Sequence, residues 1–169
     1  MNTLEALLTR RSIRKYTDEN ISNDKILKLV EAGMFAPTAF NLEPWHFIII
    51  DDKLKLNELL KVLPHAEMLH QANASILVCG DKKVQEMEGL LVQDCSAVTQ
   101  NILLAAHEHD LGACWIGIYP FKEFIDNTKN FFNLPPNIIP VSMVALGYPD
   151  EKIEQPERFK KQKIHMNKW

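Results

Sequence analysis

"APTAFNLEPWHFIII", residues 36–50, joins a loop set between two prolines to the start of a buried strand. Pro37 ends the helical pattern that precedes it, because the residue before a proline disfavours helical geometry. After Pro44 the chain becomes apolar and closes on three isoleucines, a β-branched run that favours a strand over 45–50. Since no polar residue interrupts the isoleucines, we expect this strand to be buried on both faces.

Helical and extended patterns alternate on either side of this stretch. Helices are expected at 3–10, from the N-cap Ser22 to about Pro37, and at 52–63, 88–109 and 121–132, with a helical turn near 66–70. Further strands are expected at 74–80, 113–118 and 138–147. Little of the circumference of the helix at 88–109 is wholly polar, which predicts a central, buried position. Strands separated by helices indicate an α/β or α+β fold.

Composition restricts the possible function classes. The chain has 169 residues, 46% of them hydrophobic, which suits one globular domain spanning 1–169. A net charge of −3 argues against a nucleic-acid partner. No apolar run approaches the ~20 residues of a membrane span, and no secretory cleavage pattern is recognised. Cys79, Cys95 and Cys114 are widely spaced among apolar neighbours, so we expect reduced core thiols in a cytoplasmic protein.

Arginine is concentrated in one short segment. Of four arginines in the chain, three occupy five positions, as Arg10, Arg11 and Arg14, with the hydroxyl of Ser12 among them. The planar fork of an arginine suits a phosphate or carboxylate, whereas lysine would serve a solvated surface equally well. The segment therefore predicts an anion site. The alternative is a surface cluster paired with acids such as Asp18 and Glu19.

The loop between Pro37 and Pro44 offers neutral polar groups on a rigid backbone. Thr38 and Asn41 lie between the prolines, where they suit a ring rich in carbonyls and nitrogens; the alternative is an ordinary helix-to-strand connection. Glycine-rich phosphate loops and serine-nucleophile motifs are absent. His65 and His70 are spaced wrongly for a zinc helix, so we predict no metal site there.

Five motifs in order resemble the nitroreductase family of FMN-dependent oxidoreductases. They are "RRSIRKY" (10–16), "APTAFNLEPWHFII" (36–49), "LGACWIG" (111–117), "VALGYP" (144–149) and "ERFKKQKIHMNKW" (157–169). The resemblance implies an α+β fold with a mostly antiparallel sheet wrapped by helices. It also implies an intertwined homodimer, with FMN at the subunit interface and the C-terminal tail packed on the partner.

The same resemblance implies the residues that bind the cofactor. Arg10, Arg11, Ser12 and Arg14 would bind the phosphate and ribityl chain, joined by Arg158 from the tail. From the partner subunit the loop would reach the flavin through Pro37, Thr38, Ala39 and Asn41. Ile116 and Gly117 would lie at the isoalloxazine ring. No residue is expected to act as a dedicated acid or base.

The implied activity is hydride transfer from NADH or NADPH through flavin N5 to an acceptor such as a nitroaromatic or a quinone, by a ping-pong mechanism. Two alternatives stay open: another reaction on the same fold, such as reductive dehalogenation or flavin breakdown, and a non-catalytic sensor of a phosphorylated ligand. The chain departs from the family pattern at Thr38, Phe40 and Glu43, where serine, glycine and glutamine are usual. Phe40 would line the substrate pocket, and Glu43 would disfavour an anionic reduced flavin if it faced the ring.

Overall fold

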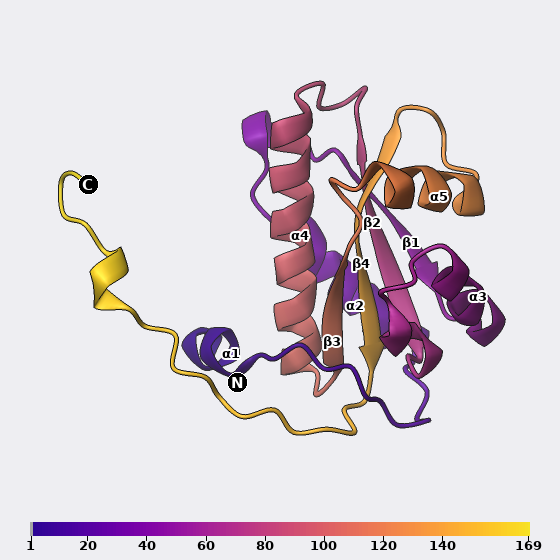
Figure 1. The fold of residues 1–169 in the computed structure, drawn as a ribbon, viewed down its shortest axis with the longest axis horizontal. Coiled ribbons are helices and arrows are strands. Elements are labelled where there is room, and N and C mark those ends of the chain that lie inside the picture. Colours follow the sequence, from indigo (N-terminus) through magenta and orange to yellow (C-terminus); the bar gives the residue numbers. More distant parts are fainter. Residues whose placement is uncertain (1) are drawn as a thin grey trace.

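The computed structural model of the chain describes residues 2–169, and its elements lie close to the expected ones (Figure 1). The strands are β1 (Trp45–Ile50), β2 (Ala74–Asp81), β3 (Gly112–Gly117) and β4 (Ile138–Gly147). The helices are α1 (Thr3–Thr9), α2 (Asn23–Met34), α3 (Lys53–Glu58), α4 (Glu88–Glu108) and α5 (Lys122–Phe132). Short 3-10 turns are η1 (Ala39–Asn41), η2 (Leu59–Lys61), η3 (Glu67–His70) and η4 (Lys161–Lys163).

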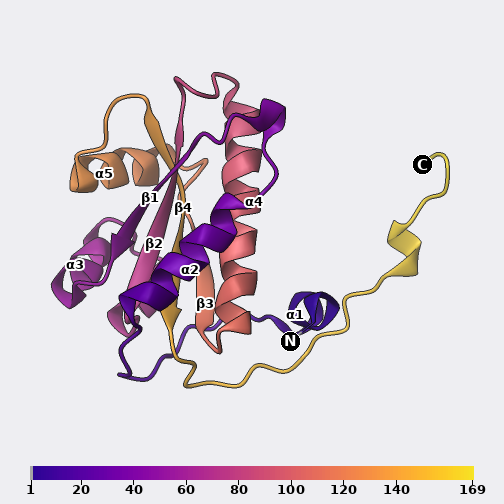
Figure 2. The ribbon, with the colours of Figure 1, turned by 180° about the vertical axis from the view of Figure 1, so that it is seen from behind.

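The four strands form one antiparallel sheet in the order β1-β2-β4-β3. This pairing decides between the two fold classes left open above in favour of α+β. Helices α2 and α4 cover one face of the sheet, while α3 and α5 lie on the other (Figures 1 and 2). None of the helices in the described residues is long and apolar enough to cross a membrane.

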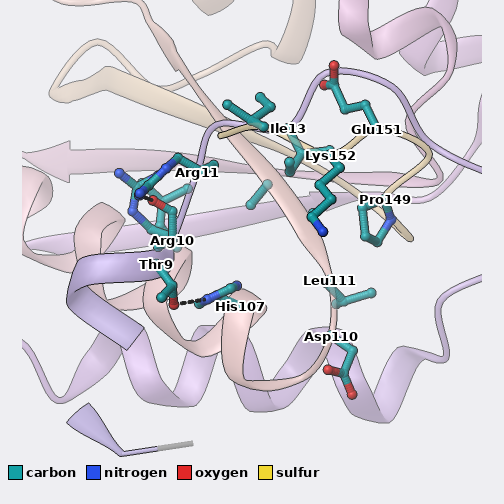
Figure 3. A pocket seen from close by; sticks show the side chains of 14 residues that line it. Thr9, Arg10, Arg11, Ile13, His107, Asp110, Leu111, Pro149, Glu151 and Lys152 are labelled. Atoms are coloured by element: carbon teal, nitrogen blue, oxygen red, sulfur yellow. Dashed lines mark hydrogen bonds between the residues drawn. The ribbon is translucent and has the colours of Figure 1, made fainter. Parts of the chain in front are cut away.

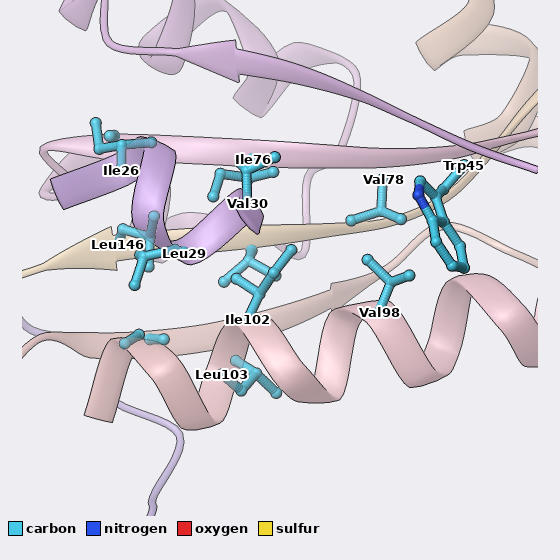
Figure 4. Close-up of a cluster of buried hydrophobic side chains, with 14 of the residues drawn as sticks. Ile26, Leu29, Val30, Trp45, Ile76, Val78, Val98, Ile102, Leu103 and Leu146 are labelled. Atoms are coloured by element: carbon cyan, nitrogen blue, oxygen red, sulfur yellow. The ribbon is translucent and has the colours of Figure 1, made fainter. Parts of the chain in front are cut away.

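The central strands alternate between two cores. Ile76 and Val78 of β2 pack toward α2 and α4, whereas Leu77 and Cys79 pack toward α3 and α5. Figure 4 shows the first core, in which Val98 and Ile102 of α4 meet side chains of α2 and the sheet. Both residues are fully buried, as the apolar circumference of α4 predicted. The expected N-cap is also present, because the Ser22 side chain accepts a hydrogen bond from the amide of Lys25.

Two expectations for the first half of the chain need correction. Full burial of the isoleucine run is wrong for Ile48 and Ile49, which are half-buried, although Ile50 is buried. The reason is that β1 is an edge strand paired only with β2. The helix expected at 52–63 ends sooner, because α3 stops at Glu58 and the chain continues as the 3-10 turn η2.

The tail leaves the body of the molecule. From Lys152 to Trp169 every residue is exposed, and Figure 1 shows this segment passing α1 and extending beyond it. The side chain of Trp169 is 99% exposed. The tail thus exposes its aromatic and aliphatic side chains, and its packing on a partner subunit stays a prediction.

All three cysteines are free and buried, as predicted. Burial raises the pKa of Cys79 and of Cys95 to about 12, far above the ~8.5 of an exposed thiol. The reactive thiolate is therefore depleted by roughly three orders of magnitude at pH 8 in the folded chain. We expect iodoacetamide at pH 8 to modify these two thiols far more slowly in native protein than in urea-unfolded protein, as peptide mass spectrometry would measure. Equal rates would contradict the buried assignment.

Candidate functional site

The arginine segment is held beside the free edge of β3. The amide of Ile13 donates to the Ala113 carbonyl at 3.0 Å, and Ser12 forms an isolated parallel bridge with Ala113. On the other side, the Glu151 carboxylate accepts from the backbone amides of Arg14 (2.5 Å) and Lys15 (3.1 Å). The segment is thus fixed between the last strand of the sheet and the start of the tail.

Three arginines meet at the end of α1. The pKa of Arg10 is lowered, first by burial and then by repulsion from Arg11 and Arg158. Arg11 donates to the carbonyls of Leu8 (3.0 Å) and Arg10 (2.6 Å) and, through Nε, to that of Glu154 in the tail (3.4 Å), so its guanidinium is committed to backbone carbonyls. The side chain of half-buried Arg10 has no hydrogen-bond or ion-pair partner among residues 2–169. An anion here would relieve the repulsion and satisfy the free guanidinium.

The arginines open onto two adjoining cavities. One of about 310 Å³ is lined by Arg10, Arg11, His107 and Lys152, among others. Figure 3 shows these side chains, with His107 Nε2 and Thr9 Oγ1 2.8 Å apart. The other, of about 330 Å³, lies between Arg10, Arg11 and the tail at Arg158. The alternative of a surface cluster paired with Asp18 and Glu19 is not borne out, since no ion pair joins them within the described chain.

Arg14 faces a different space. It lines a cavity of about 410 Å³ with His65 and residues of η3. His65 Nε2 lies 3.1 Å from the Gly117 carbonyl, to which it must donate, and its ring lies against that of Phe124 in a tilted arrangement with centroids 4.6 Å apart. This cavity therefore leads to the end of β3.

The two residues on β3 that were predicted to lie at the flavin ring differ in which of their atoms a ligand could approach. The side chain of Ile116 is 1% exposed and belongs to the core under α3 and α5, so only its backbone is near the edge. A Cβ placed on Gly117 would meet nothing within 4 Å, so the space beside it is open. From Gly112 to Gly117 the strand spans about 16 Å, at ~3.3 Å per residue. A long ligand with its anionic end at Arg10 can lie along this edge.

The loop at 36–44 lies elsewhere in the same chain. The amide of Ala39 donates to Asp94 Oδ1 at 2.9 Å, which ties the loop to the N-terminal half of α4. His107, beside the arginines, lies about 20 Å further along the helix axis. Figures 1 and 2 place η1 and β3 on opposite sides of α4. One chain therefore does not bring Pro37, Thr38, Ala39 and Asn41 to its own arginines.

Two contacts of the site were not expected from the sequence. Asp94 is a carboxylate within a mostly apolar helical pattern. This exception is visible in the sequence, but the periodicity alone does not indicate what the carboxylate contacts. His65 was considered above only as a zinc ligand, and the structure shows that it holds the peptide of Gly117. The hydroxyl of Thr38 accepts from the amides of Leu42 and Glu43, both at 3.1 Å, and its contact with the cofactor stays a prediction. Glu43 itself is exposed.

Comparison with known proteins tests the resemblance carried by the five motifs. The model of the Nitroreductase family matches residues 7–148. The chain belongs to the nitroreductase family. A protein of Methanothermobacter thermautotrophicus, provisionally named NADH dehydrogenase/NAD(P)H nitroreductase, is 41% identical over 169 residues, covering 100% of this chain and 88% of its own.

Solved structures confirm the predicted α+β nitroreductase fold. A Parabacteroides distasonis protein with the same provisional name superposes with a TM-score of 0.95 at 39% identity, over 100% of both chains. The FMN-dependent nitroreductase of Clostridium difficile superposes with a TM-score of 0.91 at 28% identity, over 99% of this chain and 100% of that one. The nitroreductase motifs at Arg10–Tyr16 and Gly112–Gly117 thus lie on the fold expected for them.

Proposed function

We propose that this nitroreductase-family chain is an NAD(P)H-dependent flavin oxidoreductase that works as a homodimer with FMN at the interface. The observation that carries the proposal is the half-buried side chain of Arg10, which has no partner among residues 2–169 and lies beside Arg11 and Arg158 near the edge of β3. When bound, FMN would supply the redox chemistry, which is hydride transfer through flavin N5 from NADH or NADPH to an acceptor, such as a nitroaromatic or a quinone, in a ping-pong cycle.

The donors at the arginine cluster fit a phosphate monoester. Arg10 and Arg158 would bind the phosphate oxygens, with Ser12 adding a hydroxyl, while Arg11 fixes the turn that presents them. A dianion suits this place because three like charges repel one another there in its absence. Side chains would supply all of these contacts to the phosphate, which agrees with the absence of glycine between residues 7 and 17.

The other end of the β3 edge fits a flat ring system. Arg14 would place positive charge near the ring and favour its reduced, anionic form. Gly117 leaves room for close approach of the ring, and His65 holds the Gly117 peptide in one orientation. These groups bind and orient, and none is placed to transfer a proton to an acceptor.

Two observations support a second copy of the chain as part of the site. The chain exposes 10319 Å², whereas a folded monomer of 19.4 kDa exposes about 8,500 Å². The excess coincides with exposed apolar side chains on α1, near the loop and along the tail, among them Leu4, Phe35, Phe40 and Trp169. Because the loop and the arginines lie apart in one chain, the partner's loop would complete each site.

An anaerobic spectral titration of the FMN-loaded protein tests the proposal. We expect NADH or NADPH to bleach the flavin absorbance near stoichiometry, because the open edge beside Gly117 leaves the ring accessible. Reoxidation by a quinone or a nitroaromatic would then complete the cycle. Tight FMN binding without reduction by either nicotinamide would overturn the reductase assignment in favour of a sensor or of another reaction on this fold.

A further inference from the structure

We propose that Asp94 is a positioning residue, which holds the loop 37–43 in the conformation that the partner's flavin meets. The inference rests on the proposed function, because it assumes that this loop completes the site of the second subunit. Asp94 touches neither the arginines nor β3 of its own chain; it would act only through the loop backbone, by the hydrogen bond from Ala39.

The cost of burying this carboxylate indicates a specific role. Asp94 is 5% exposed on a helix whose other inward side chains, such as Leu91 and Val98, are apolar except for the hydrogen-bonded Thr99. Its Oδ1 accepts from Ala39, whereas Oδ2 has no partner among residues 2–169. A buried carboxylate with one oxygen unsatisfied is destabilising, and an apolar residue would pack this position at lower cost. The residue therefore supports something other than the stability of the helix.

The loop that it holds has a strained backbone. Phe40, Asn41 and Glu43 have φ of 57°, 56° and 50°, in the left-handed region that phenylalanine and glutamate rarely adopt. Such a conformation persists only where the surroundings determine it. Inside the loop, Thr38 Oγ1 accepts from the amides of Leu42 and Glu43. Asp94 is the anchor from outside, at the first residue of the turn.

The geometry gives the anchor a defined consequence. Phe40 is 74% exposed and Asn41 is also exposed, so both project away from their own chain. Their direction depends on where the turn begins, and Asp94 sets that point relative to α4. Without the anchor the loop would sample other conformations, and FMN binding would have to order it again. The expected result is a weaker FMN complex in a dimer that is otherwise folded.

The test is a fluorescence titration of the dimeric apoprotein with FMN for wild type, Asp94→Ala and Asp94→Asn. We expect Asp94→Ala to raise the Kd about 10- to 100-fold, and Asp94→Asn to stay within about threefold of wild type, because the asparagine oxygen can still accept from Ala39. Ala39→Pro removes the donor instead, in a position where Thr38 already has the extended backbone that a following proline requires, and should reproduce the loss. It also keeps the test decisive if Asp94→Ala does not fold.

Thr99→Val is the matched control. Thr99 is buried on the same helix, and its hydroxyl pairs with Ser142 Oγ at 2.7 Å, away from the loop. This variant should lower the melting temperature of the apoprotein and leave the FMN Kd unchanged. A dimeric Asp94→Ala protein with wild-type Kd, or an Asn variant as weak as the Ala variant, would overturn the inference. If wild type itself binds no FMN, it is the proposed function that fails.

Discussion

Arg10→Ala is expected to weaken FMN binding by roughly 10- to 150-fold, the range that corresponds to losing charge-assisted hydrogen bonds. Arg10 and Arg11 are the half-buried members of the arginine cluster, and of the two only Arg10 has a guanidinium without a competing partner among the described residues. Its whole donor set is therefore available to a phosphate. Equilibrium titration of the apoprotein with FMN measures the loss directly.

A second readout separates binding from folding. The pKa of Arg10 is lowered by burial and by two neighbouring arginines, so the charged side chain is disfavoured in the empty site. Removing it should leave the apoprotein at least as stable in urea as wild type. Arg10→Lys keeps the charge but loses the planar fork, and should bind FMN with intermediate affinity.

Lys61→Ala, which removes one exposed charge on η2, serves as the control for net charge and should not change the affinity. An Arg10→Ala variant with wild-type FMN affinity would remove Arg10 from the site. An equal loss of FMN affinity in Arg10→Ala and Lys61→Ala would also remove Arg10 from the site, because general electrostatics would then account for the effect.

The parts of the fold that could be predicted were those in which one physical requirement dominates. The runs at 74–80 and 138–147 are buried on both faces because they form the two central strands, and apart from the buried serines Ser75 and Ser142 they carry no polar side chain. The 21-residue helix α4 carries apolar residues nearly all round because it packs on the sheet and α2. In each case burial requires apolar side chains, and the apolar pattern is therefore visible in the sequence.

The pairing of strands and the contacts between residues distant in sequence could not be predicted in this way. The isoleucines of β1 resemble those of a central strand, yet their place at the sheet edge depends on long-range pairing. The arginines were recognised as an anion site by residue type alone, and the structure places three of them together. Asp94 and His65 were missed because each acts through one hydrogen bond to a backbone group distant in sequence. No periodicity encodes such a contact.

Gly112→Ala is expected to weaken FMN binding by about tenfold or more without changing any side chain that is proposed to bind FMN. A Cβ at Gly112 would lie 2.7 Å from Cγ2 and 2.9 Å from Cβ of Ile13. Rotation of the Ile13 side chain cannot remove this clash, because its Cβ is fixed by the backbone and its amide is hydrogen-bonded to the Ala113 carbonyl. The methyl group must push the segment that carries Arg11, Ser12 and Arg14 away from β3.

The same overpacking should cost about 1–3 kcal/mol of unfolding free energy, measured in urea on the apoprotein. Gly89→Ala is the control, since a Cβ there meets nothing within 4 Å, and in α4 it should stabilise by up to ~1 kcal/mol with unchanged FMN affinity. If Gly112→Ala lowered stability but bound FMN normally, the placement of the arginines would not depend on the β3 edge. If stability and FMN affinity fell together, Gly112 would be needed to position the arginine segment, because the absence of a side chain there leaves room for Ile13 against β3.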